Sequence, residues 1–182
     1  LYSCYTAWHL VHGNIQEQLK GETLTHLSER MVIDMLYSNN QEYQIFALEN
    51  VNIEKYKEHY LQIAEIFKTS TPLVRSILAK GIATKYKDTP HLQYPFWEAF
   101  DVVDSGSRSL LVQCLGEAPD HVYNILSAKL SIMSKNQLKV FLNHLVNRDK
   151  VIPNVKKDIE TFARSKGETY AYLAQEFLER QK

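Results

Sequence analysis

Apolar residues recur every three or four positions along most of the chain, which is the spacing that lines one face of a helix. The segments 56–67, 138–145 and 170–178 show this spacing most clearly. No stretch of four or more residues outside such segments alternates apolar and polar side chains as a half-buried strand does. The pattern therefore predicts an all-α fold of about eleven helices, each of roughly 9 to 18 residues.

Several helix ends are marked by residues that satisfy the free backbone groups there. Proline fits the first turn of a helix, so Thr71 and Pro72 predict a helix start. Ser134, followed by Gln137 three residues later, has the form of a capping box. Ser105 is expected to cap another helix. Two glycines are predicted to end helices in the left-handed conformation, Gly116 and Gly167.

The predicted connections are mostly of about 2 to 6 residues, so neighbouring helices must pack antiparallel as stacked hairpins. This favours an irregular α-solenoid of the HEAT or armadillo kind over a compact bundle, although no repeat of fixed period is present. We expect a single all-helical domain over residues 1–182. Because the chain begins at Leu1 rather than Met, we also expect it to be a segment of a longer protein.

The composition of the chain says more about its cellular compartment than about its function. Lys plus Arg and Asp plus Glu both total 21, so no global charge draws the chain to nucleic acid or an anionic membrane. The only two cysteines, Cys4 and Cys114, are far apart, which fits a reducing compartment. No apolar run is long enough to predict a membrane span. We expect an intracellular protein of the cytoplasm or the nucleus.

Motifs that carry catalytic chemistry are absent from the sequence. There is no glycine-rich phosphate loop, and no nucleophile elbow. His9 and His12 could share a metal ion but lack a third ligand nearby, and Asp101 and Asp104 lack the setting of an acid–base pair. We therefore expect no catalytic residue, no cofactor and no metal ion.

Charge is distributed unevenly along the neutral chain. Residues 129–166 hold nine basic against three acidic residues, whereas residues 98–120 hold five acidic residues and one basic residue. We expect the basic residues to form a ridge across adjacent helices, where a solvated face is the simplest interpretation, ahead of a site for an acidic peptide or nucleic acid. The nine candidates are Lys129, Lys135, Lys139, Arg148, Lys150, Lys156, Lys157, Arg164 and Lys166.

Aromatic residues gather after one helix start, at Tyr94, Phe96, Trp97 and Phe100. Such residues anchor many protein interfaces, but here we favour a place in the core.

These observations support a non-catalytic protein–protein interaction scaffold, a helical-repeat segment of a larger intracellular protein that binds a peptide or a partner subunit. Two alternatives remain open. One is a nucleic-acid-binding helical domain that uses the basic region 129–166. The other is a helical accessory domain of an enzyme whose catalytic part lies outside this chain.

Overall fold

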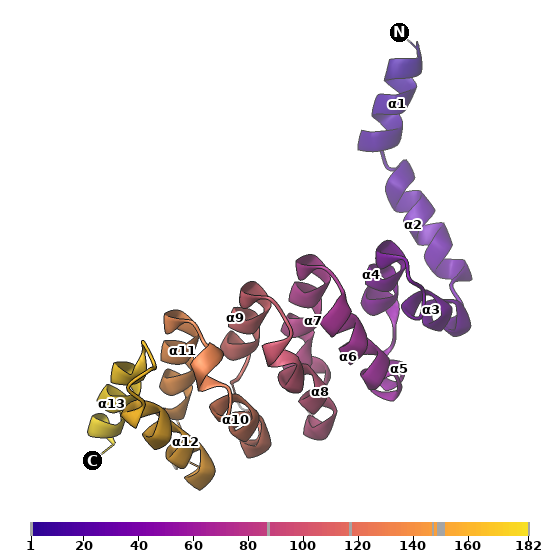
Figure 1. The fold of residues 1–182 in the computed structure, drawn as a ribbon. Coiled ribbons are helices and arrows are strands. Elements are labelled where there is room, and N and C mark those ends of the chain that lie inside the picture. The colour runs from indigo at the N-terminus through magenta and orange to yellow at the C-terminus, as the bar shows by residue number, and fades with distance from the viewer. Residues whose placement is uncertain (1, 87, 117, 147, 149–151, 182) are drawn as a thin grey trace. The chain divides into compact units, whose positions relative to one another are not determined.

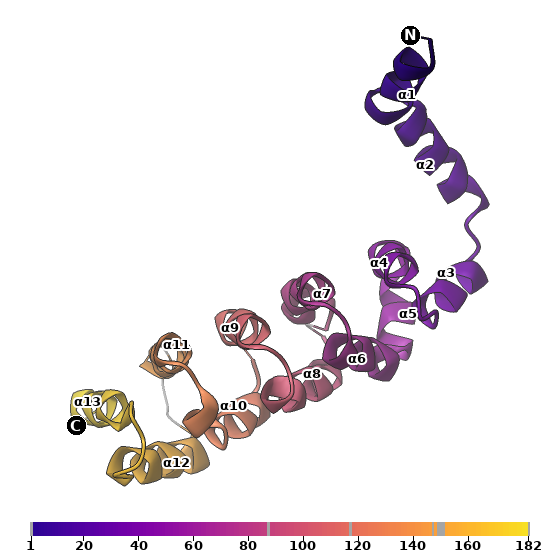
Figure 2. The same ribbon diagram turned by 45° about the horizontal axis from the view of Figure 1, so that its top comes forward.

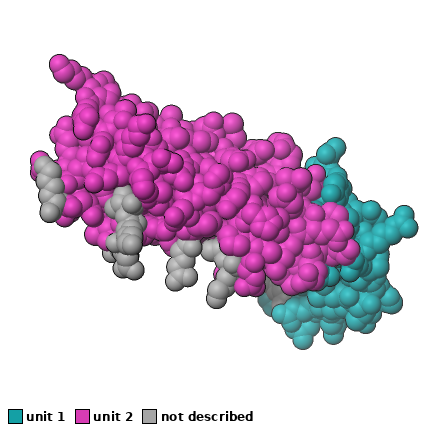
Figure 3. All heavy atoms as spheres, turned by 90° about the horizontal axis from the view of Figure 1, so that it is seen from below, with its two compact units in different colours: residues 1–52 teal, residues 53–182 magenta. Residues whose placement is uncertain are grey.

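The computed structural model of the chain describes residues 2–86, 88–116, 118–146, 148 and 152–181. All regular structure in these residues is helical and none is strand, which confirms the predicted all-α class. None of the described helices is both long and apolar enough to cross a membrane. Contacts divide the chain into two compact units, residues 1–52 and residues 53–182, coloured teal and magenta in Figure 3. The single domain expected over residues 1–182 stays a prediction.

The described residues of unit 1 form four helices: α1 (Tyr2–His12), α2 (Ile15–His26), α3 (Glu29–Leu36) and α4 (Gln41–Asn50). Its small core lies between α3 and α4, where Val32, Leu36, Ala47 and Leu48 are buried. Helix α4 starts at Asn40, whose side chain accepts a hydrogen bond from the Glu42 amide at 2.9 Å. In contrast, no described side chain of α1 or α2 is buried.

Unit 2 contains the remaining helices. They are α5 (Ile53–Glu58), α6 (Tyr60–Thr69), α7 (Pro72–Lys85), α8 (Tyr94–Glu98), α9 (Ser105–Gln113), α10 (Asp120–Ser127), α11 (Lys135–Val146), α12 (Pro153–Arg164) and α13 (Ala171–Arg180). Three short 3-10 turns join them: Pro90–Gln93, Ala99–Asp101 and Leu130–Ile132.

Most helices of unit 2 lie in two rows, and each helix contacts the next one of its own row. The first row is α7, α9, α11 and α13, and the second row is α6, α8, α10 and α12 (Figures 1 and 2). Contacts between the rows include those of α6 with α7 and of α12 with α13. One long face of each helix is thereby buried against its neighbours, and the opposite face is left to solvent.

The predicted helix starts at Pro72 and Ser134 are confirmed. Helix α7 has Thr71 as its N-cap and Pro72 as its first residue. At α11 the Ser134 amide donates to Gln137 Oε1 at 3.0 Å, and the Gln137 amide donates to Ser134 Oγ at 3.4 Å. The two side chains thus satisfy two otherwise free amides, as a capping box does.

Three boundary predictions need correction. Asp104, not Ser105, caps α9, because the Asp104 carboxylate reaches the Ser107 amide at 3.0 Å and Ser105 is already helical. Gly116 has the predicted positive φ of 36°, but among the described residues it is the only glycine that does, so Gly167 ends no helix in that conformation. The segment 56–67 is two helices rather than one, since α5 and α6 meet at His59.

The core of unit 2 is rich in aromatic rings. Phe96, Trp97 and Phe100 are buried, which confirms the predicted place in the core for these three, whereas Tyr94 of the same cluster is only half-buried. The Phe96 ring centroid lies 5.6 Å from that of Phe67 and 5.7 Å from that of Tyr86, so α6, α7 and α8 meet around it. Aromatic pairs at this separation add to the stabilisation that burial provides.

Candidate functional site

Lys129, the first of the nine candidate cations, is committed to an ion pair inside unit 2. Its ammonium donates to Asp101 Oδ1 at 2.6 Å and to the Glu98 carbonyl at 2.8 Å. The side chain is 21% exposed. Lys129 therefore ties the end of α10 to the turn after α8 and has little freedom to meet a partner.

Arg148 is used in the same way. Its guanidinium donates to Asp120 and to the Ala118 carbonyl, and it lies 4.4 Å from the centroid of the Tyr123 ring. Asp101 and Asp120 belong to the acidic stretch 98–120, so folding pairs part of that stretch with part of the basic one. The charge separation seen along the sequence is thus smaller in space. Lys150 lies outside the described residues.

Six of the nine candidates are exposed: Lys135, Lys139, Lys156, Lys157, Arg164 and Lys166. Lys156, Lys157 and Arg164 belong to α12 in the second row, and Arg164 is paired with Glu160 at 3.8 Å. Lys135 and Lys139 belong to α11 in the first row. Because α11 and α12 lie in different rows, a single ridge across both helices stays a prediction.

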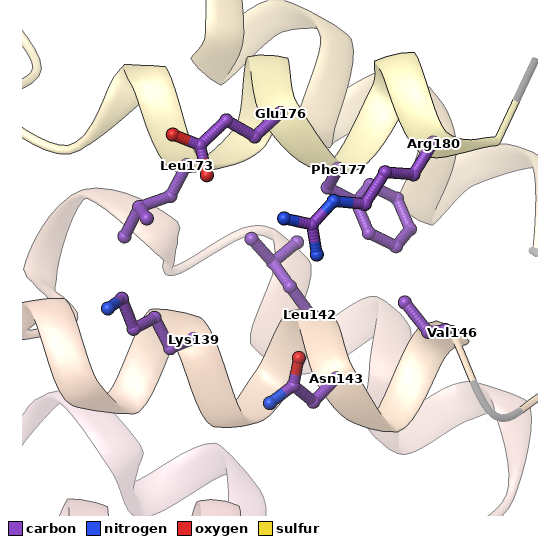
Figure 4. Close-up of a pocket in the computed structure, with 8 residues that line it drawn as sticks. All are labelled: Lys139, Leu142, Asn143, Val146, Leu173, Glu176, Phe177 and Arg180. Atoms are coloured by element: carbon purple, nitrogen blue, oxygen red, sulfur yellow. The ribbon is translucent and has the colours of Figure 1, made fainter.

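The structure brings Lys139 to a groove between α11 and α13, shown in Figure 4. The two helices run in the same direction there, and the groove encloses about 260 Å³. Its apolar lining comes from Leu142 and Val146 of α11 and from Leu173 and Phe177 of α13. Leu142, Leu173 and Phe177 are buried and hold the helices together, so they form a floor rather than a loose patch.

The rim of the groove is polar. Lys139 and Asn143 rise from α11, and Glu176 and Arg180 rise from α13. Figure 4 shows the Lys139 ammonium and the Arg180 guanidinium both extending toward the gap, one below Leu173 and the other above Leu142. Within the part of the chain that the structure describes, neither cation forms an ion pair.

A third cation continues the groove toward the start of α11. The Lys135 ammonium lies 5.8 Å from the centroid of the Tyr172 ring on α13, within the range of a cation–π contact. Its contact with the Tyr172 side chain raises the pKa of Lys135 above the ordinary value, so this amine stays charged. Three cations therefore face one carboxylate, that of Glu176, along the α11–α13 groove.

Hydrogen bonds hold Asp101 and Asp104, the two aspartates three residues apart, in their ionised form. A hydrogen bond from Lys129 lowers the pKa of Asp101. Burial by itself would raise the pKa of Asp104, but hydrogen bonds from Ser107 and Arg75 hold it well below its usual range. Both carboxylates therefore stay ionised at neutral pH, so neither can act as an acid.

Potential metal ligands are scattered among the described residues. These residues contain no group of three or more His, Cys, Asp or Glu side chains that could hold a metal ion. His9 packs against the Tyr5 ring at 4.3 Å, and the side chain of His12 lies outside the description.

A second hollow, of about 240 Å³, lies between the end of α10 and α12 and has the opposite character. It is lined by hydroxyls and by Asp158 and Glu168, and Ser127 donates to Asp158 at 2.5 Å. Its charge would favour a cationic group. This hollow and the α11–α13 groove therefore favour ligand groups of opposite charge.

Sequence reasoning found Lys135 and Lys139 but missed the rest of the α11–α13 groove. Arg180 and Glu176 lie beyond the basic stretch, which ended at Lys166. Their spacing of four residues was a readable signal that they share a face of the last helix. Nothing in the sequence indicated that this face lies beside α11.

Among known proteins, no family model, curated protein or solved structure matches the chain.

Proposed function

We propose that this chain is a non-catalytic scaffold for protein–protein interaction, a helical-repeat segment of a larger intracellular protein. In this proposal unit 2 is part of an irregular α-solenoid of the HEAT or armadillo kind. The two rows of helices support it, because each helix contacts the next one of its row as stacked repeats do. Such stacking creates extended surfaces that bind peptides or partner subunits.

The observation that carries the proposal is the α11–α13 groove. An apolar floor bordered by cations without ion-pair partners is a surface that folding of the described residues leaves unused. Its volume of about 260 Å³ lies below the roughly 300–1,000 Å³ of pockets that enclose small-molecule ligands. A side chain or two from a partner protein fits this size better than a cofactor does.

Affinity capture with the tagged chain, followed by mass spectrometry, tests the scaffold function. The chain should recover a partner in stoichiometric amount, and the two purified proteins should form a complex of defined mass by size exclusion with light scattering. Failure to recover any partner from several lysates of the source organism, with and without cross-linker, would contradict the proposal.

A second candidate function is nucleic-acid binding, favoured by exposed cations on and just after α12, namely Lys156, Lys157, Arg164 and Lys166. Binding that depends on phosphate contacts weakens steeply with salt. Duplex and single-stranded probes titrated at low and physiological salt would detect it. Binding that disappears in the Lys156→Glu, Lys157→Glu double variant would support this function, whereas no binding at either salt concentration would exclude it.

A further inference from the structure

We propose that the α11–α13 groove binds a short, extended, acidic segment of a partner protein. One aliphatic side chain of that segment lies on the floor of the groove, and carboxylates on either side of it pair with Lys139 and Arg180. This inference rests on the proposed scaffold function and names the site and the chemistry of its ligand.

The apolar part of the ligand follows from the floor and its size. Leu142, Leu173 and Phe177 line one side of a space that corresponds to roughly nine water molecules. Displacing that water with an aliphatic side chain removes apolar surface from solvent on both partners. Leucine, isoleucine, valine or methionine satisfies this requirement.

The acidic part follows from the charges at the rim. Lys139 and Arg180 come from opposite helices and extend over the same gap without ion-pair partners among the described residues. A carboxylate can accept from either, and the planar guanidinium of Arg180 can donate two parallel hydrogen bonds to it. Glu176 repels a wholly acidic ligand, so the apolar residue must be placed between acidic ones.

The length of the segment follows from the helix that borders it. Helix α11 spans twelve residues, or about 18 Å at 1.5 Å per residue. An extended chain covers this distance with about five residues at 3.3 Å each. Lys135 and Tyr172 border the end near the start of α11, so a further acidic residue there can pair with Lys135.

A nucleic acid fits this groove less well than an acidic peptide. Its backbone offers no aliphatic group to the floor, and its phosphates would lie close to the Glu176 carboxylate. Three cations also fall short of the roughly six to ten phosphate contacts of a typical nucleic-acid-binding protein.

Selection from a library of random nonapeptides displayed on phage tests the ligand directly, with the purified whole chain as bait at low salt. The enriched peptides should share an aliphatic residue with Asp or Glu within two positions on each side. Synthetic versions should bind with roughly micromolar Kd values, and raising the salt should weaken them because the contacts at the rim are ionic.

Charge reversal in the groove should then remove the binding. The Lys139→Glu, Arg180→Glu double variant should weaken the selected peptides about tenfold or more. Lys156→Glu on α12 is the matched control, since it reverses the charge of a lysine that is also exposed but lies outside the groove, and it should leave the affinity unchanged. Circular dichroism of each variant verifies that the helices remain intact.

Three results would overturn the inference: no enriched peptide, a basic consensus, or a consensus peptide that binds the double variant as well as it binds the unchanged chain. The scaffold function is tested by a separate result. If a partner is captured equally well by the double variant, the chain is a scaffold that uses another surface, and only the groove assignment is wrong.

Discussion

Helices α1 and α2 of unit 1 and helices α11 and α13 of unit 2 all carry apolar side chains but use them differently. Tyr2, Tyr5 and Trp8 of α1 are all more than half exposed, whereas Leu138, Phe141 and Leu145 of α11 are fully buried. The first pair of helices has no row to pack against within its unit. The second pair lies in a row and shares a buried seam.

This difference shows that helical spacing of apolar residues does not by itself determine burial. A helix of about 12 residues is only marginally stable in water without tertiary packing. Helices α11 and α13 have that packing and so can hold Lys139 and Arg180 in fixed positions beside an apolar floor. For this reason we place the binding site at α11 and α13 rather than on the exposed aromatic side chains of α1.

Hydrogen exchange should show the largest contrast between these two regions. Amides of α1 and α2 should exchange about a thousandfold faster than those of α9 and α11, because no described side chain of the first pair is buried. Mass spectrometry after pulses from seconds to hours measures both regions in one sample. Equal protection would contradict the comparison and show that α1 and α2 pack against something in solution.

A Leu→Ala substitution should lower the free energy of unfolding by several kcal/mol more in α11 than in α2. Leu138→Ala, at a position with no exposed surface, should lower the free energy of unfolding by about 2 to 5 kcal/mol. Leu19→Ala in α2, at a position 62% exposed, should change it by less than about 0.5 kcal/mol. Urea unfolding followed by ellipticity gives both values, and similar costs would refute the assignment of burial.

Removing a helix cap should lower stability in both units, but only in unit 2 should the loss depend on pH. Asp104→Ala should cost about 2 kcal/mol at pH 7, because a cap and a charged hydrogen bond to Arg75 are lost. Asn40→Ala should cost about 1 kcal/mol. The folded-state pKa of Asp104 is depressed, so its contribution is full above about pH 5, begins to fall near pH 4, and is lost only as the pH drops through the lower folded-state pKa.

Unfolding both variants at pH 7 and at pH 3 therefore gives different pH trends. The deficit of Asp104→Ala should shrink at the lower pH, because the carboxylate of the unchanged protein is then protonated in the unfolded chain but stays ionised in the folded protein, which favours the unfolded state. That of Asn40→Ala should stay constant, since an amide does not titrate. A deficit of Asp104→Ala that is the same at both pH values would show that the carboxylate is not held by Ser107 and Arg75.

Quenching of tryptophan fluorescence is the smallest expected effect, but it reports on both regions in one measurement. Trp8 is 57% exposed in α1, and Trp97 is 1% exposed in α8. Acrylamide should quench an accessible and a shielded component of the emission, and Trp8→Phe should remove only the accessible one. Steep quenching that persists in this variant would mean that the core around Trp97 is open.

Most of the helices could be predicted from the sequence, because the residues that mark where a helix begins act over a few neighbouring positions. Pro72 and the Ser134–Gln137 pair act within one turn of a helix, so their effect is readable without tertiary structure. Asp104 was missed as a cap because Ser105 beside it has the same preference, and the bonds of the Asp104 carboxylate to Ser107 and Arg75 become visible only in the structure. The break at His59 interrupts an apolar pattern that continues through it.

The candidate site was predictable only in part, because it depends on pairing between distant segments. Lys129 and Arg148 looked like surface cations, yet each meets an aspartate 28 residues earlier in the chain. Arg180 lines the same groove as Lys139 only because α13 packs on α11. Sequence spacing identifies a face of one helix but not the helix that lies next to it.

Site-specific photo-cross-linking tests the central claim most directly. Benzoylphenylalanine introduced at Asn143, on the rim of the α11–α13 groove, should cross-link to the selected peptide and to the captured partner. The same group introduced at Trp8 in α1 should not. Cross-links from position 8 with none from position 143 would place the binding surface on the exposed aromatic side chains and contradict the account.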